Sequence, residues 1–208
     1  MINMLARLAW YKGDKDIFYL DDLIADFRIQ EVQKAGAVFD SAKLDWINNH
    51  HLAALSFDAF NERLAPFLES VGIDCTQKVN SKEIVAAMRS SKPTLLGVAR
   101  DLIPYFSDVE SYDEKAANKF LIGSEPVLEF VQRKLNGLEI WNEESIDHAL
   151  KEAQTSLSLP TPKLNQPIRI AMTGSTQSPS LGLTLSLFDS VEVNKRIDAA
   201  LKYLANSN

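Results

Sequence analysis

Arg169 is the residue whose type and setting best suit ligand binding, because it interrupts an apolar run near the C-terminus. Its planar guanidinium can donate to two acceptors at once, which suits the edge of an RNA base. We expect Ile168–Met172 to be a short extended segment, with Arg169 pointing away from the core. Thr173–Ser175 would offer amides and hydroxyls close by, and Ser178-Pro179 would start a helix whose N-terminal amides favour an anion or an electron-rich base edge. The alternative is a solvent-facing arginine followed by an ordinary turn.

Elsewhere the sequence carries no set of residues suited to catalysis or metal binding. His50 and His51 are adjacent, so on a helix they would point about 100° apart and could not share a metal ion. His148 is remote from both, and the lone Cys75 excludes a disulfide within the chain and a thiolate zinc site. Phosphate-binding loops, dinucleotide fingerprints and Gly-x-Ser-x-Gly elbows are absent. We therefore expect no catalytic residue, no metal and no cofactor in this chain.

The composition is that of an ordinary globular protein, with 46% apolar and 24% charged residues among 208. A net charge of −6 argues against indiscriminate nucleic-acid binding, which comes largely from phosphate neutralisation. Binding also depends on where charge lies, and from Thr161 onward five basic residues outnumber three acidic ones. No apolar run reaches the roughly 20 residues that span a bilayer, no signal sequence is evident, and a lone cysteine suits a reducing compartment. We expect a soluble, cytoplasmic protein.

The hydrophobic periodicity predicts an all-α architecture of several short helices. Ser56 and Thr94 are expected N-caps, and Asn80 and Glu83 have the spacing of a capping box. Pro66 could kink or break its helix, and three prolines predict that Leu159–Pro167 is a loop. The expected helices span about 57–71, 80–88, 94–104, 126–137, 141–157 and 191–204.

Three regions in sequence order resemble the C-terminal part of bacterial glutamyl-tRNA synthetases. Leu5–Trp10 is similar to the helix that follows the catalytic domain. Gly36–Asp40 and Lys43–Asn48 are similar to the stem-contact region. Pro167–Ser175, with Ser178-Pro179 after it, is similar to the tail that helps to read the tRNA anticodon. The resemblance implies the helical anticodon-binding region of a class I aminoacyl-tRNA synthetase.

The resemblance also implies a division of the chain and a function. Residues 1–55 would end the stem-contact region, and 56–118 and 119–208 would form two helical anticodon-binding subdomains. The implied function is tRNA selection for glutamate-tRNA ligase, whose catalytic domain would lie before Met1 and would use ATP and magnesium. Expected partners are tRNA and that domain, but neither DNA nor a membrane. The acidity of the chain favours an alternative, a helical protein-interaction module without RNA binding.

For the anticodon, the resemblance implies contacts at four positions near the C-terminus. The family's anticodon-reading arginine aligns with Arg169, and a contacting apolar residue aligns with Leu181. Thr173 and Ser178 are the expected surroundings of Arg169.

A second anticodon contact is implied where Met88-Arg89-Ser90-Ser91 precedes a helix that begins near Thr94. Family members that accept only the glutamate tRNA place an arginine against the last anticodon base, and that position pairs here with Ser91. Serine cannot make a bidentate contact, so the resemblance implies a relaxed choice between glutamate tRNA and glutamine tRNA. The alternative pairing gives the reading role to Arg89 or Lys92.

For the tRNA stem, the expected contacts lie near the N-terminus. Asp40 would cap a helix whose Leu44 and either Ile47 or Trp46 turn inward, leaving Lys43 and Asn48 accessible. Lys43 would contact a phosphate, which positions RNA without reading its sequence. Arg7 would meet RNA or an acidic surface of the catalytic domain. The alternative for Lys43 is a solvated surface charge.

Overall fold

The computed structural model describes residues 1–11, 13–33, 36, 38–77 and 80–207. Throughout these ranges the regular structure is helical, so the predicted all-α architecture is confirmed. Of the segments that carry the resemblance, Gly36–Asp40 includes Ala37, which lies outside the described residues.

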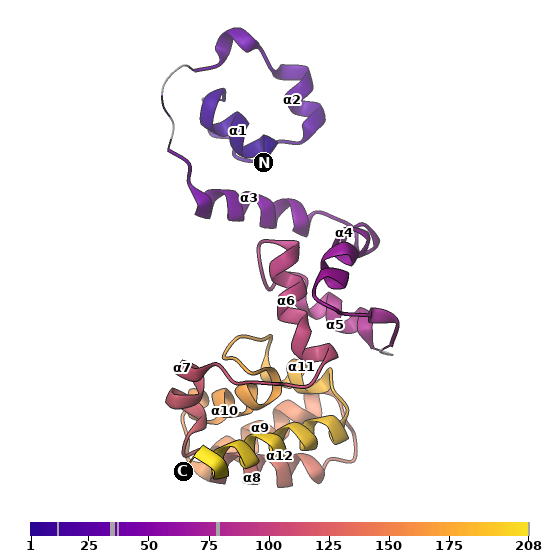
Figure 1. Ribbon diagram of the computed structural model, residues 1–208, viewed down its shortest axis with the longest axis vertical. Helices are drawn as coiled ribbons and strands as arrows, with labels where there is room; N and C mark the ends of the chain where they lie inside the picture. The colour runs from indigo at the N-terminus through magenta and orange to yellow at the C-terminus, as the bar shows by residue number, and fades with distance from the viewer. Residues whose placement is uncertain (12, 34–35, 37, 78–79, 208) are drawn as a thin grey trace.

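The first half of the chain runs along the long axis of the molecule (Figure 1). Helices α1 and α2 lie at one end, α3 follows, and α4, α5 and α6 occupy the middle. The short turns η1 (Ile29–Glu31) and η2 (Cys75–Gln77) lie between these helices. The helices are α1 (Ile2–Ala9), α2 (Leu20–Asp26), α3 (Ser41–Ala53), α4 (Phe57–Ser70), α5 (Ser81–Met88) and α6 (Leu95–Phe106).

The second half forms a helical bundle at the opposite end of the molecule (Figure 1). Within it α9 packs on α8 and α11, and α12 packs on α8 and α10. A π-helical segment, η3 (Ala117–Leu121), follows α7 and contacts α10. The helices are α7 (Glu114–Ala116), α8 (Glu125–Asn136), α9 (Glu143–Leu157), α10 (Thr161–Thr173), α11 (Leu181–Ser186) and α12 (Ser190–Ser207).

Buried apolar side chains form one continuous core from Leu52 to Leu204 and a smaller cluster near the N-terminus. The smaller cluster contains Trp10, Phe18 and Leu23, and the Trp10 indole donates to a Glu31 carboxylate oxygen at 2.9 Å. The division of the chain at residues 55 and 118 stays a prediction.

Helix starts follow local capping chemistry. Asp40, Ser56 and Thr94 accept hydrogen bonds from the backbone three residues ahead, at 3.1, 3.2 and 3.1 Å, as predicted. The capping box predicted at Asn80 is wrong, because the Asn80 side chain accepts no hydrogen bond from the first turn of α5; its Nδ2 donates to the Leu187 carbonyl oxygen at 2.6 Å. The helix with Pro66 continues to Ser70, and α6 continues two residues beyond Pro104.

Helix α10 corrects two predictions, because neither the loop over 159–167 nor the extended run over 168–172 is present. Leu164, Ile168, Ala171 and Met172 recur at helical spacing and are at most 1% exposed. Burying a leucine, isoleucine or methionine side chain stabilises a fold by about 1.5–3 kcal/mol, which outweighs the weak strand preference of isoleucine. The helix ends at Gly174, whose φ of 74° suits glycine and whose N–H donates to the Ile170 carbonyl oxygen at 2.8 Å.

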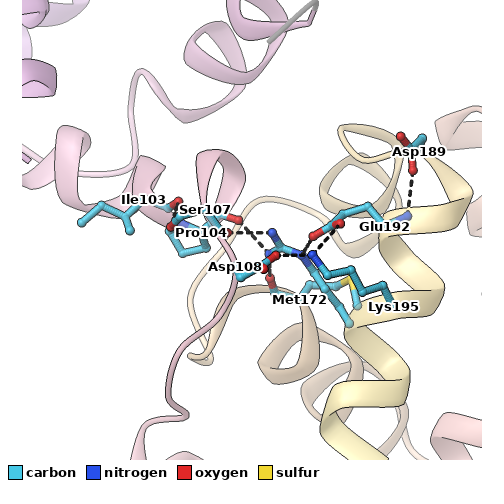
Figure 2. Close-up of polar contacts among 9 residues, drawn as sticks. Ile103, Pro104, Ser107, Asp108, Met172, Asp189, Glu192 and Lys195 are labelled. Atoms are coloured by element: carbon cyan, nitrogen blue, oxygen red, sulfur yellow. Dashed lines mark hydrogen bonds and ion pairs between the residues drawn. The ribbon is translucent and has the colours of Figure 1, made fainter. Parts of the chain in front are cut away.

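Arg196 ties α12 to the ends of α6 and α10. Figure 2 labels four of its partners, Pro104, Ser107, Met172 and Glu192. Its side chain is buried, and Nη1 donates to the carbonyl oxygens of Pro104 and Met172 at 2.7 and 2.5 Å. Nη2 donates to the Ser107 carbonyl oxygen at 2.8 Å, and Nε to a Glu192 carboxylate oxygen at 2.6 Å. One guanidinium therefore fixes the orientation of α6 against the bundle.

Candidate nucleic-acid interface

Arg169 points from α10 toward the segment just before α11. Its Nη1 donates to the carbonyl oxygens of Ser178 and Pro179 at 2.7 and 2.6 Å, and to the Ser178 hydroxyl. The side chain is half-buried, and this burial lowers the pKa of Arg169, while Tyr105 opposes the shift. The expectation that Arg169 points outward from an extended segment is wrong, because the helix turns it onto this loop.

Ser178 and Pro179 precede the helix rather than start it. Ser180 is the N-cap of α11 and accepts a hydrogen bond from the Leu183 N–H at 3.3 Å. The Ser178 hydroxyl lies 2.9 Å from the Thr184 hydroxyl. Since α11 has only 6 residues, we assign no anion site to its N-terminus.

Thr173 and Leu181 lie in the protein interior. Thr173 is 7% exposed and its hydroxyl donates to the Arg169 carbonyl oxygen at 3.0 Å, while Leu181 is 4% exposed. Their side chains therefore present little surface to a ligand.

Arg89 joins the end of α5 to the junction between α3 and α4. Nη2 donates to the carbonyl oxygens of Leu52 and Ala53 at 3.0 and 3.2 Å and also to that of Leu55. The guanidinium lies 5.1 Å from the centre of the Phe60 ring. These contacts direct Nη2 toward the backbone of the α3–α4 junction.

Ser91 and Ser178 line one cavity of about 470 Å³. It lies between the end of α5, α6 and the segment after α10, and Asp101 of α6 contributes a carboxylate. The structure thus brings together two residues that the resemblance implied, although they are far apart in sequence. The described lining residues are Ala87, Met88, Ser90, Ser91, Asp101, Thr176, Gln177, Ser178 and Pro179.

Lys92 bridges two sides of this cavity. Its Nζ donates to Gln177 Oε1 at 2.6 Å and lies 3.7 Å from Asp101 Oδ2. No sequence motif pointed to Asp101 or Gln177. The polar face of α6 could have drawn attention to Asp101, but its proximity to residues 177–178 depends on tertiary packing.

The residues expected to contact the tRNA stem lie in two places. Arg7 Nε and Lys43 Nζ lie 3.0 and 2.8 Å from one Asp16 carboxylate oxygen. The hydrogen bond from Lys43 lowers the pKa of Asp16. Asn48 lies apart from them and donates to the Pro93 carbonyl oxygen at 2.5 Å, so it links α3 to the turn before α6.

Of the two alternatives on α3, Ile47 turns inward and Trp46 does not. Ile47 is 1% exposed, whereas Trp46 is 52% exposed, so the alternative with Trp46 in the core is wrong. The Trp46 ring lies 6.2 Å from that of His50 on the surface of the helix.

In the part of the chain that the structure describes, no three histidine, cysteine, aspartate or glutamate residues are grouped so that they could hold a metal ion. None of the helices there is both long and apolar enough to cross a membrane.

Comparison with known proteins identifies relatives for nearly the whole chain. Glutamate--tRNA ligase 2 of Coxiella burnetii (strain Dugway 5J108-111) is 34% identical over 206 residues, which cover 98% of this chain and 44% of the ligase. Glutamate--tRNA ligase 2 of Halorhodospira halophila (strain DSM 244 / SL1) is 32% identical over 205 residues, which cover 98% of this chain and 43% of that ligase. This chain therefore spans less than half the length of these curated relatives.

Solved structures agree on the fold. A glutamate tRNA ligase from Elizabethkingia meningosepticum superposes with a TM-score of 0.80 at 24% identity, over 98% of this chain and 40% of that one. The glutamate-tRNA synthetase of Elizabethkingia anophelis gives a TM-score of 0.77 at 25% identity, and the superposition covers 97% of this chain and 40% of the synthetase. The predicted resemblance to the C-terminal part of these ligases is confirmed. Because the family model described as "Anticodon binding domain" matches residues 59–201, most of the chain, the chain belongs to that family.

Proposed function

We propose that this chain binds tRNA and supplies anticodon recognition to a glutamate-tRNA ligase. The observation that carries the proposal is the match to the anticodon binding domain over residues 59–201, within which Ser91 and Ser178 line one cavity. Hydroxyls can both donate and accept, so the cavity suits the edge of an unpaired base. Bases displayed in a loop can enter such a cavity, whereas paired bases in an A-form helix cannot.

Arg169 and Arg89 would act by shaping this interface. Arg169 holds the Ser178-Pro179 segment in place, and Arg89 anchors the end of α5, where Ser91 follows. We propose that Thr173 and Leu181 support Arg169 and its loop in the same indirect way.

The tRNA stem would contact the opposite end of the chain. Arg7 and Lys43 share a single carboxylate, that of Asp16, which leaves one positive charge in excess at this point. We propose that this excess charge contacts a stem phosphate. Asn48 would help to fix α3 against the turn at Pro93.

Glutamylation itself would use ATP and magnesium, in the part of a ligase that this chain does not span. The reaction would take place in the cytoplasm. The described residues offer no cluster of metal ligands, so we assign them no step that uses magnesium. Their contribution would be to select and hold the tRNA.

Ser91 further suggests a relaxed choice between glutamate tRNA and glutamine tRNA. Its hydroxyl can pair with either the donor or the acceptor groups of a base, so it distinguishes bases poorly. Charging of the two purified tRNAs by a full-length ligase containing this region would test the idea. Strict rejection of glutamine tRNA would contradict it.

Binding of this chain to glutamate tRNA across a salt series tests the main proposal, with Ser91→Trp as the variant. A bulky indole in place of the hydroxymethyl group would obstruct the cavity, so we expect affinity to fall at least roughly tenfold, or about 1.4 kcal/mol. Ser156→Trp is the matched control, because Ser156 is an exposed serine of α9 that lines a separate cavity. Equal loss of binding in both variants, or no binding by the wild type at low salt, would refute the proposal.

One observation favours a second function, protein binding without RNA. Apolar side chains of α1 and α2 border a cavity of about 680 Å³, and Leu5, Ile24 and Ile29 are 53%, 69% and 67% exposed. In a ligase, we propose that the catalytic part covers this face. Indifference to tRNA at all salt concentrations, together with tight binding of a defined protein through this face, would support the second function instead.

A further inference from the structure

The cavity that contains Ser91 and Ser178 has one ionised side chain among its described lining residues, Asp101. Asp101 lies midway along α6, and its side chain is 26% exposed. The cavity volume of about 470 Å³ is within the range of small-molecule sites, which is roughly 300–1,000 Å³. A carboxylate in such a position limits which ligands can enter with their hydrogen bonds satisfied.

Lys92 holds the edge of this cavity through contacts that are easily exchanged. Its ammonium group meets Gln177 on one side and Asp101 on the other, at 2.6 and 3.7 Å. The side chains of Lys92 and Asp101 are 33% and 26% exposed, so their ion pair is partly solvated and costs little to open. The positive charge also offsets the repulsion that Asp101 would exert on an incoming phosphate.

We propose that Asp101 is a specificity-determining residue, which accepts a hydrogen bond from the exocyclic amino group of a base that enters the cavity. The inference rests on the proposed tRNA-binding function and names the chemical group that the site selects. An ionised carboxylate can only accept hydrogen bonds, whereas the hydroxyls of Ser91 and Ser178 can do both. Cytosine, adenine and guanine carry exocyclic amino groups and uracil does not, so Asp101 disfavours uracil.

Lys92 has a separate role in this arrangement. When RNA binds, its ammonium group exchanges Asp101 and Gln177 for a backbone phosphate. A phosphate contact strengthens binding without reading sequence. Asp101 therefore sets the base preference, and Lys92 sets affinity for every base alike.

The test measures binding of the full 208-residue chain to a set of RNA hairpins. The hairpins share one stem, and each of the three anticodon positions carries each of the four bases in turn. At one position the wild type should bind the amino-bearing bases roughly tenfold more tightly than uracil, which is within the discrimination of a good base contact. Asp101→Asn keeps the shape but can also donate, so uracil should bind this variant about as well as cytosine.

Two further variants keep the result interpretable. Asp108→Asn is the matched control, because Asp108 also pairs with a lysine, Lys195, but lies outside this cavity. It should retain the wild-type preference. Lys92→Met should weaken all hairpins by a similar factor and leave the preference unchanged.

The outcomes separate the inference from the function on which it rests. If hairpins bind but Asp101→Asn keeps the wild-type preference, or weakens all four bases equally, Asp101 only stabilises the loop and the inference is overturned. If no hairpin binds the wild type at low salt, both the proposed function and the inference fail.

Discussion

Replacing Arg196 should destabilise the protein strongly. The buried guanidinium donates to the carbonyl oxygens of Pro104 and Ser107 at the end of α6 and to that of Met172 at the end of α10. These two segments are far apart in sequence and meet only in the folded protein. The bond to Met172 is buried, so loss of its donor costs about 2 kcal/mol, while each of the other two carbonyls is part-buried and costs about 1 kcal/mol. The total of about 4 kcal/mol for Arg196→Ala agrees with the cost of breaking a buried charged pair.

Urea unfolding followed by circular dichroism would measure this free energy. For a chain of this length, about 4 kcal/mol corresponds to a fall of roughly 8–16 °C in Tm. Arg196→Lys should lie between the wild type and Arg196→Ala, because one ammonium group cannot reach all three carbonyls. Lys195→Ala is the control, since Lys195 immediately precedes Arg196 on α12 but its side chain is 55% exposed. We expect no change in its unfolding midpoint.

A loss below about 0.5 kcal/mol for Arg196→Ala would refute this reasoning, because that is the size expected of an ordinary surface substitution. So would an equal loss in Lys195→Ala, since the effect would then come from helix α12 and not from the guanidinium contacts.

Three further predictions concern the stability of the protein at other positions. Gly174→Ala should lower the unfolding free energy by about 2 kcal/mol in urea, because its φ is +74° and the new Cβ would lie 2.8 Å from the Ser111 carbonyl oxygen. Arg89→Met should cost about 2 kcal/mol in the same assay, because carbonyls at the end of α3 lose their charged donor, and an unchanged midpoint would contradict this. Burial lowers the pKa of His51 below 6.5, so its contribution to stability is complete above pH 6.5 and is lost as the pH falls through the folded-state pKa. An NMR titration midpoint of His51 at or above 6.5 would contradict that direction.

Most helices could be predicted because their signals are local. Ser56, Thr94 and Asp40 cap their own helices through contacts three residues away, and the apolar spacing of each helix is visible within about four turns. Helix α5 begins after Asn80 as predicted, but the Asn80 side chain makes no capping hydrogen bond. Its Nδ2 donates to the Leu187 carbonyl oxygen, in a part of the chain that local sequence cannot anticipate.

Helix α10 was missed because local preference and tertiary burial disagree there. Pro162, Pro167 and the β-branched isoleucines weaken a helix. Pro162 lies in the first turn, where a missing N–H costs nothing, and Ile168 and Ile170 are fully buried. Packing on η3, α8 and α12 therefore decided the conformation, and with it the direction of Arg169.

The cavity could be predicted only in part. The resemblance supplied Ser91 and Ser178 separately, but their shared position depends on the loop after α10 folding back onto α5 and α6. Asp101 and Gln177 belong to no motif. Lys92 links them, and it is 85 residues away from Gln177 in sequence. Contacts of this kind cannot be derived from spacing along one chain.

The use of arginine in this protein limits how it can recognise RNA. Arg89, Arg169 and Arg196 each donate to backbone carbonyls at the ends of helices and loops, and each thereby fixes one segment against another. One terminal nitrogen of Arg89, one of Arg169 and all three guanidinium nitrogens of Arg196 are engaged in this way, and the chain carries a net charge of −6. These bonds restrict how far the three arginines can turn toward a base, so groups that face a cavity and have hydrogen-bonding capacity left are better placed for base selection. The carboxylate of Asp101 and the hydroxyl of Ser91 meet both conditions, because each lines the same cavity and each can accept a further hydrogen bond.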